Sequence, residues 1–241
     1  MNRSEINTIL RDADAFINER GFLLPPFAYW SPEEWAEKTG EVQEIVERRL
    51  GWDITDFGQG DFDRCGLFLF TLRNGDRSAL QTGKGKLYAE KILVVGVNQV
   101  TPLHLHRVKT EDIINRGGGN LVIQLYNSTN AGELADTDVV VSIDGMSRTV
   151  HAGETVILTP GESICLVPGL YHAFWGEESR VLVGEVSTVN DDETDNYFYK
   201  PVGRFPSIHE DEPPLYLLVN DYDRYYQQQL AAGQASSSHE E

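Results

Sequence analysis

The sequence predicts a mainly β fold, in which short antiparallel strands close into a barrel or sandwich behind a helical N-terminal extension. The first 50 residues carry apolar side chains at helical spacing together with helix-start signals. From about residue 65 the chain changes to short β-branched and aromatic segments separated by Gly, Asn, Asp or Pro. Strands and helices do not alternate along the 241 residues, so a parallel sheet is not expected.

The helical extension is expected over residues 1–60, packed on the barrel. Residues 4–20 repeat apolar side chains every three or four positions. The repeat consists of Ile6, Ile9, Leu10, Ala13, Phe16 and Ile17. The segment Ser31-Pro32-Glu33-Glu34 combines an N-cap, a proline at the first helical position and a capping-box glutamate. One or two further helices are therefore expected over residues 32–50.

The barrel is expected over residues 61–230, followed by a small polar tail at 231–241 that is expected to be disordered. The predicted strands are 67–73, 87–98, 120–126, 138–143, 147–151, 155–159, 163–167, 171–175 and 180–188. Asp144-Gly145 is a hairpin turn signal between two of them. A closing strand and a short helix are expected over residues 215–230.

Composition narrows the classes of partner. Acidic residues outnumber basic ones by 38 to 20, which gives a formal net charge of −18. Such a field repels phosphate backbones and anionic lipid, so neither nucleic acid nor a membrane is expected as a partner. Cys65 and Cys165 each lie in an apolar run and are expected to be buried rather than disulfide-bonded. No membrane span or signal peptide is recognised, so a cytoplasmic protein is expected.

Four side chains have the types and spacing of a metal site. His104 and His106 are two positions apart, so on a strand both imidazoles face the same side. Glu111 follows five residues later, across a gap that can form a hairpin. His172 follows the rigid turn Pro168-Gly169-Leu170-Tyr171, which can aim the ring inward. Either segment alone is weak evidence, but together they predict one divalent metal ion with open coordination positions, as in catalytic sites.

These two segments resemble the two signature motifs of the cupin superfamily. The first motif corresponds to Gly96, His104, His106, Glu111 and Gly117–Gly119, and the second to Gly161, Pro168, Gly169 and His172. The resemblance implies a jelly-roll β-barrel with the ion inside it. The two motifs are unusually far apart, which we interpret as an inserted hairpin around Asp144-Gly145. The cupin fold hosts many functions and does not by itself identify one.

Longer segments are similar to the bacterial D-lyxose isomerases. They are EKILVVGVNQVTP, TPLHLHRVKTEDIINRGGGNLVIQLYN, EVSTVNDDETDNYF and GRFPSIHEDEPPLYLLVNDY, and the likeness covers about residues 20–226. It implies an aldose–ketose isomerase that interconverts D-lyxose and D-xylulose, often D-mannose and D-fructose as well, through an enediol. It also implies a monosaccharide substrate and one divalent ion per chain. Manganese is expected, with zinc, cobalt or iron as alternatives. A homodimer is expected.

The enediol reaction needs a base and groups that handle the oxygen protons. Lys91 interrupts the apolar run KILVVGV and by strand parity can face the barrel interior or solvent. Glu185 lies on the strand RVLVGEVS with the same two alternatives. Asp192 and Asp195 lie in the acidic loop NDDETDN, where the ordinary role is solvation or a turn. The resemblance favours Glu185 and Asp195, so Lys91, Glu185 and Asp195 are the predicted catalytic residues.

Two further residues are predicted to bind substrate. Gln99 lies near the first motif and can hold substrate or orient a ligand, and Arg204 in GRFP can reach a sugar hydroxyl or pair with an acid. Two other functions fit the same four ligands. A ferrous dioxygenase would consume oxygen with iron, and a sugar-binding cupin would bind a monosaccharide without turnover.

Overall fold

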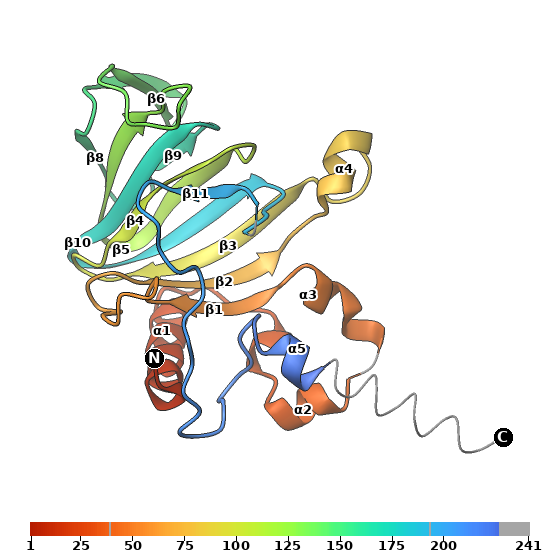
Figure 1. The fold of residues 1–241 in the computed structure, drawn as a ribbon. Helices are drawn as coiled ribbons and strands as arrows, with labels where there is room; N and C mark the ends of the chain where they lie inside the picture. The colour runs from red at the N-terminus through yellow and green to blue at the C-terminus, as the bar shows by residue number, and fades with distance from the viewer. Residues whose placement is uncertain (39, 193, 227–241) are drawn as a thin grey trace, which may run out of the picture.

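The computed structural model describes residues 1–38, 40–192 and 194–226 (Figure 1). The predicted tail at 231–241 and the last residues of the predicted barrel range lie outside this part of the chain. Among the described residues, no helix is both long enough and apolar enough to cross a membrane.

The described elements are mainly strands, with helices concentrated before residue 50. In chain order they are α1 (Arg3–Glu19), η1 (Pro26–Tyr29), α2 (Pro32–Ala36), η2 (Gly40–Val42), α3 (Gln43–Glu47), β1 (Gly51–Thr55), β2 (Leu67–Arg73), α4 (Arg77–Thr82), β3 (Tyr88–Val95), β4 (Thr101–His106), β5 (Glu111–Asn127), β6 (Val139–Ile143), β7 (Met146–Val150), β8 (Thr155–Leu158), β9 (Ser163–Leu166), β10 (Leu170–Thr188), β11 (Asn196–Phe198) and α5 (Tyr222–Tyr225).

Within the helical extension, α1 and η1 pack against the outer side of β1, β2 and β3, and Figure 1 shows α2 and the C-terminal helix α5 on the same side of the sheet. α1 starts at an Asn2 capping box and buries its apolar face, including Ile6, Leu10 and Phe16, against these strands. The predicted Ser31 capping box is present at α2. Strand β1 lies inside the range assigned to the extension; because all five of its residues are buried, it lacks the alternation that marks a half-exposed strand. The domain boundary at residue 60 stays a prediction.

The strands form one antiparallel sheet that curls on itself. Its order is β1-β2-β3-β10-β5-β9-β6-β7, with β4 paired to β10 and β11, and β8 paired to β5. The long strand β10 joins the two predicted strands 171–175 and 180–188. Its first half lies between β4 and the end of β5, and its second half lies between β3 and the start of β5. This shared strand bends the sheet into the predicted cupin barrel.

The interior of the barrel is apolar away from one end. Its buried cluster draws on most strands and includes Leu93, Ile113, Leu125, Ile164 and Val183. The inserted hairpin is confirmed: β6 pairs with β7 across a turn whose two central residues both have positive φ. Both cysteines are free thiols, as expected, but each is half-buried and not fully buried.

One expected hairpin is wrong. The chain does reverse between His106 and Glu111, but the described part of β4 pairs with β10 and β11 and not with β5. The reversal is held instead by Asp195, which accepts hydrogen bonds from the backbone N–H groups of Arg107, Val108 and Lys109. The carboxylate of Asp195 thus takes the place of the backbone hydrogen bonds that would hold a hairpin.

Candidate metal centre

Three histidines meet at the open end of the barrel. His104 and His106 project from one face of β4, as their spacing predicts, and His172 on β10 lies directly across the ladder from His104. One ring nitrogen from each lies within 4.8 Å of the others, and all three residues are buried. Strand pairing therefore brings together two segments that are far apart in the sequence.

Glu111 completes the group. It is the first residue of β5, and its Oε1 lies 3.3 Å from His106 Nε2 and 3.1 Å from His172 Nε2. Its side chain is only 2% exposed. Glu111 therefore lies against two of the three histidine rings.

The hydrogen bonds of two of the three rings fit a metal site. Nδ1 of His104 lies 2.8 Å from the carbonyl oxygen of Pro102, and Nδ1 of His172 lies 3.1 Å from that of Leu170. These contacts assign the proton to Nδ1 and leave Nε2 as the free donor of an electron pair, the usual arrangement around a ligating histidine. Nε2 of His172 is buried without a hydrogen-bond partner, although it lies close to Glu111. A buried nitrogen and a carboxylate that converge without bonding are what a cation between them would satisfy.

Electrostatics keep these groups in the ligating forms. Burial lowers the pKa of His104 and of His106, so both rings are neutral at neutral pH. Burial alone would raise the pKa of Glu111, but the adjacent Lys109 ammonium and the histidines hold it well below its ordinary value. A divalent transition metal suits neutral imidazoles and a carboxylate.

A buried network of opposite charges continues from Glu111. Lys109 Nζ lies 2.6 Å from Glu111 Oε2 and 2.9 Å from Glu185 Oε1. Lys91 Nζ lies 3.4 Å from the same Glu185 oxygen and donates to Asn190 Oδ1 at 2.7 Å. Burial alone would raise the pKa of Glu185, but Lys109 and Lys91 hold it below its ordinary value. Glu185 is therefore an anion held between two cations, and it lines the same pocket as His104 and His106.

A second ion-pair group closes the pocket. Arg204 Nη2 lies 2.6 Å from Asp53 Oδ2 and 3.3 Å from Asp192 Oδ2. Burial opposes the charge on Arg204, but the two aspartates raise its pKa above the ordinary value. The pKa of Asp192 lies well below its ordinary value, because Lys91 and Arg204 outweigh the effect of burial. Arg204 and Asp192 therefore both stay ionised.

The pocket combines these charges with apolar walls. Its polar lining consists of Lys91, Thr101, His104, His106, Lys109, Glu111, Glu185, Asp192, Asn196 and Arg204, and its apolar lining consists of Phe57, Leu67, Leu69, Leu93, Ile113, Phe174 and Phe198. Hydroxyl-binding groups on an apolar scaffold match a small polar ligand.

Three of the five predicted catalytic or substrate-binding residues line this pocket: Lys91, Glu185 and Arg204. Asp195 is not in the pocket wall, and its oxygens bond the backbone of the loop before Glu111. Gln99 is also outside the wall. Its Nε2 donates to the carbonyl of Phe62, and its Oε1 accepts from the N–H of Gly96.

The sequence did not indicate Lys109, and it indicated Asp192 only as a candidate beside the ligands that was left out of the predicted catalytic set. Lys109 lies in the loop between His106 and Glu111, where no periodicity predicts the direction of a side chain. Its position two residues before Glu111 was the one available signal. Asp192 lies in an acidic loop whose ordinary role is solvation or a turn, and its contact with Arg204 joins two segments twelve residues apart.

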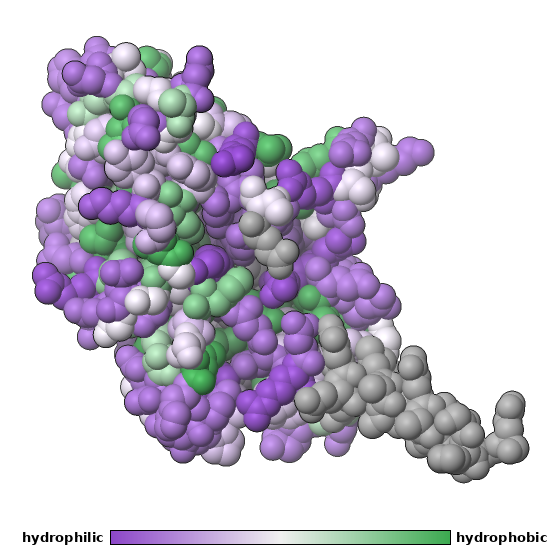
Figure 2. Space-filling view, viewed as in Figure 1, coloured by the Kyte–Doolittle hydropathy of each residue, from purple (hydrophilic) through white to green (hydrophobic). Residues whose placement is uncertain are grey.

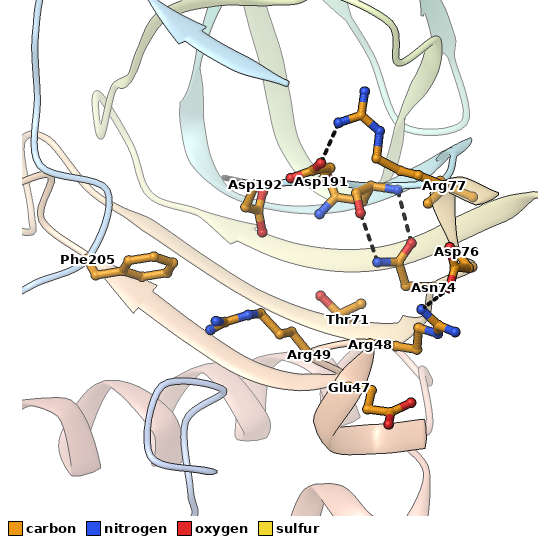
Figure 3. A pocket seen from close by; sticks show the side chains of 13 residues that line it. Glu47, Arg48, Arg49, Thr71, Asn74, Asp76, Arg77, Asp191, Asp192 and Phe205 are labelled. Atoms are coloured by element: carbon orange, nitrogen blue, oxygen red, sulfur yellow. Dashed lines mark hydrogen bonds and ion pairs between the residues drawn. The ribbon is translucent and has the colours of Figure 1, made fainter. Parts of the chain in front are cut away.

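A second, wider hollow of about 330 Å³ adjoins this pocket, and Asp192 lines both (Figure 3). The amide of Asn74 bonds both backbone groups of Asn190. Figure 3 also shows Arg77 paired with Asp191. Figure 2 shows mostly hydrophilic residues on this hollowed face between the barrel and α4. The wall of this outer hollow is polar and its charges are largely paired.

An antiparallel barrel that gathers three histidines, close enough together to hold a metal ion, defines a cupin-type protein with a candidate metal site. Comparison with known sequences is more specific. The profile of the D-lyxose isomerase family matches residues 1–222. Curated D-lyxose/D-mannose isomerases from Serratia proteamaculans and Escherichia coli O157:H7 are each 50% identical over 228 residues, which cover 93% of this chain and 99% and 100% of theirs. The chain belongs to the D-lyxose isomerase family.

Solved structures agree on the fold. L-ribose isomerase from Cellulomonas parahominis superimposes with a TM-score of 0.58 at 14% identity, covering 87% of this chain and 98% of that one. L-ribose isomerase from Acinetobacter sp. DL28 gives a TM-score of 0.57 at 15% identity with the same coverage. At these identities the likeness extends to the fold alone.

Proposed function

We propose that this protein is a metal-dependent aldose–ketose isomerase that interconverts D-lyxose and D-xylulose, and D-mannose and D-fructose. The relatives that are half identical over nearly their whole length are D-lyxose/D-mannose isomerases. The observation that carries the proposal is the Glu185 carboxylate, held between Lys91 and Lys109 beside the histidine cluster. A base next to two proton donors is what an enediol reaction requires.

His104, His106, Glu111 and His172 would hold one divalent ion, which we infer to be manganese. Such an ion supplies Lewis-acid stabilisation of the negative charge that develops on the sugar oxygens. The donor set of three imidazoles and one carboxylate also suits zinc, cobalt or iron, so the identity of the metal rests on measurement.

The side chains beside the ligands would carry the proton transfers. Glu185 is ionised because two lysines lower its pKa, so it can take the proton from the sugar carbon and return it to the neighbouring carbon. Lys91 and Lys109 would donate hydrogen bonds to the sugar oxygens. Arg204 would bind a substrate hydroxyl. Asp195 was predicted to be catalytic, but its three backbone hydrogen bonds favour a positioning role, in which it fixes the loop that carries Lys109.

Gln99 would affect the site indirectly, through the backbone that it holds, and not through contact with the substrate. Its amide joins Gly96 to the carbonyl of Phe62 and fixes the turn before β4. We infer that it orients the strand that carries His104 and His106 rather than the substrate. We further infer a homodimer in the cytoplasm, the state that suits a barrel with free sheet edges and a metabolic enzyme.

The test is a conversion assay on protein stripped of metal and then loaded with manganese. D-xylulose from D-lyxose and D-fructose from D-mannose are expected with metal and not without it. Fully loaded protein that forms neither ketose would overturn the proposal. Oxygen consumption with iron would instead indicate a dioxygenase, and binding without turnover would indicate a sugar-binding cupin.

A further inference from the structure

Unpaired polar atoms are concentrated at one place in this protein. In residues 1–38, 40–192 and 194–226, six buried side-chain atoms lack a hydrogen-bond partner. Two belong to the metal-site histidines, and the others are Asp53 Oδ1, Thr101 Oγ1, Asn196 Oδ1 and Arg204 Nη1. Thr101, Asn196 and Arg204 all line the pocket beside the histidines. Because an unpaired buried polar group destabilises the fold, such a concentration indicates a ligand that supplies the missing partners.

The orientation of the Asn196 amide follows from its neighbour. Its Nδ2 donates to Asp192 Oδ1 at 3.2 Å. Asp192 stays a carboxylate, because Lys91 and Arg204 hold its pKa well below the ordinary value in spite of burial. Turning the amide around would place two oxygens against each other, so Asn196 must present Oδ1 as the unpaired atom. That atom can only accept a hydrogen bond.

Thr101 reaches the same pocket through a β-bulge. It lies three residues before His104, and in a regular strand the two side chains would point to opposite faces. The ladder with β10 pairs His104 with His172 and Thr101 with Phe174, so three steps on β4 correspond to two on β10. The extra residue reverses the alternation, and both side chains line the pocket. A bulge that turns a buried, unpaired hydroxyl toward a cavity has a cost in stability that a bound ligand would offset.

We propose that Thr101 and Asn196 are specificity-determining residues that bind hydroxyl groups of the sugar other than those at the two reacting carbons. The three unpaired atoms complement a polyol: Arg204 Nη1 donates, Asn196 Oδ1 accepts, and Thr101 Oγ1 does both. An anionic ligand would meet Asn196 Oδ1 and the Asp192 carboxylate, so the pocket favours a neutral sugar. This inference rests on the proposed isomerase function.

The test compares Thr101→Val and Thr101→Ser with the unaltered enzyme on D-mannose and its 3-deoxy, 4-deoxy and 6-deoxy analogues. Valine keeps the shape of threonine and removes the hydroxyl. We expect kcat/KM of Thr101→Val on D-mannose to fall about tenfold or more, because a site built to bind a hydroxyl discriminates strongly when the bond is lost. On one deoxy analogue the variant and the unaltered enzyme should agree within about threefold, and Thr101→Ser should retain most of the activity.

Asn196→Leu is expected to give the same pattern with a different deoxy sugar. Thr149→Val, on the exposed face of β7, is the matched control and should behave as the unaltered enzyme on every sugar. Equal loss on D-mannose and on all deoxy analogues would indicate a structural role and overturn the proposal, as would no loss at all.

Calorimetry with D-mannitol separates this proposal from the proposed function. Manganese-loaded protein should bind the alditol more weakly as Thr101→Val and as Asn196→Leu, by about tenfold in Kd. If the unaltered protein forms no ketose, the isomerase proposal fails while this measurement still decides the role of the two side chains. Unchanged mannitol affinity in both variants would contradict it.

Discussion

The ammonium of Lys109 lies 2.6 Å from Oε2 of Glu111, whose other oxygen faces His106 and His172. One carboxylate thus connects the candidate metal ligands to the lysine-rich half of the pocket. Lys109 also contacts Glu185, so one buried cation contributes to the ionisation of two buried carboxylates. The position of the ligands and the ionisation of the candidate base are therefore linked through Lys109.

Replacing Lys109 with methionine should destabilise the metal-free protein. The change leaves Glu111 and Glu185 as buried carboxylates with one fewer cation, and breaking a buried ion pair costs about 3–5 kcal/mol. Urea unfolding of the metal-free variant should show this loss, and added manganese should recover part of it. Lys200→Met, at an exposed position, is the control. Equal unfolding free energies for Lys109→Met and the control would contradict the linkage.

Removing His172 should abolish metal retention without unfolding the chain. The ring contributes one of the converging nitrogens, and the loss of a ligand weakens metal binding by about 100-fold or more. After dialysis of manganese-loaded protein, His172→Ala should contain little metal by elemental analysis. His151→Ala serves as the control, because that histidine lies on the surface and pairs with Asp138. Full occupancy in His172→Ala would remove this residue from the ligand set.

Asp195 should affect turnover without affecting metal occupancy. Asp195→Ala leaves three backbone N–H groups of residues 107–109 without acceptors, which costs about 3 kcal/mol and loosens the loop that carries Lys109. We expect kcat to fall while KM changes little and bound manganese stays near one ion per chain. Loss of the metal together with activity would assign Asp195 to the metal site itself.

The contact between the N- and C-terminal segments should weaken in acid. Arg3 is fully buried and bonds Glu210 and Asp221, and its hydrogen bond lowers the pKa of Glu210 below the ordinary 4.5. A lowered carboxyl pKa stabilises the fold above that ordinary value, and the contribution is lost as the pH falls through the folded value. Urea unfolding from pH 7 to pH 3 should show this decline.

Arg3→Met tests the same cluster directly. At pH 7 the variant should be about 3–5 kcal/mol less stable, because two carboxylates lose their buried partner. Its stability should also decline less steeply in acid than that of the unaltered protein. Parallel pH profiles for the two proteins would show that Arg3 does not set the pKa of Glu210.

The ligands could be predicted because local rules determine their directions. Two-residue alternation places His104 and His106 on one face, and the Pro168-Gly169 turn leads His172 into a strand. The helical extension was equally accessible, since capping boxes and apolar spacing are local. Local rules also predicted the Asp144-Gly145 hairpin that separates the two motifs.

The rest of the site depends on contacts between segments that are far apart in the sequence, and no local sequence pattern predicts such contacts. The bulge that turns Thr101 inward exists only in the ladder between β4 and β10. Lys109 lies in a loop that is held by Asp195, more than eighty residues later in the chain. Parity left Lys91 and Glu185 with two possible faces, and only the pairing of β3 with β10 placed them side by side. The buried strand β1 likewise had no alternation to reveal it.

The central claim is that Glu185 moves a proton between adjacent sugar carbons beside the metal site. The most direct test is D-lyxose isomerisation by manganese-loaded protein in heavy water, followed by removal of the metal and proton NMR of the products. We predict D-xylulose that carries deuterium at C1 in the fraction of turnovers in which protonated Glu185 exchanges with solvent and the transferred substrate proton in the rest, and loss of the ketose in Glu185→Gln with its metal retained. Full conversion by Glu185→Gln would contradict it.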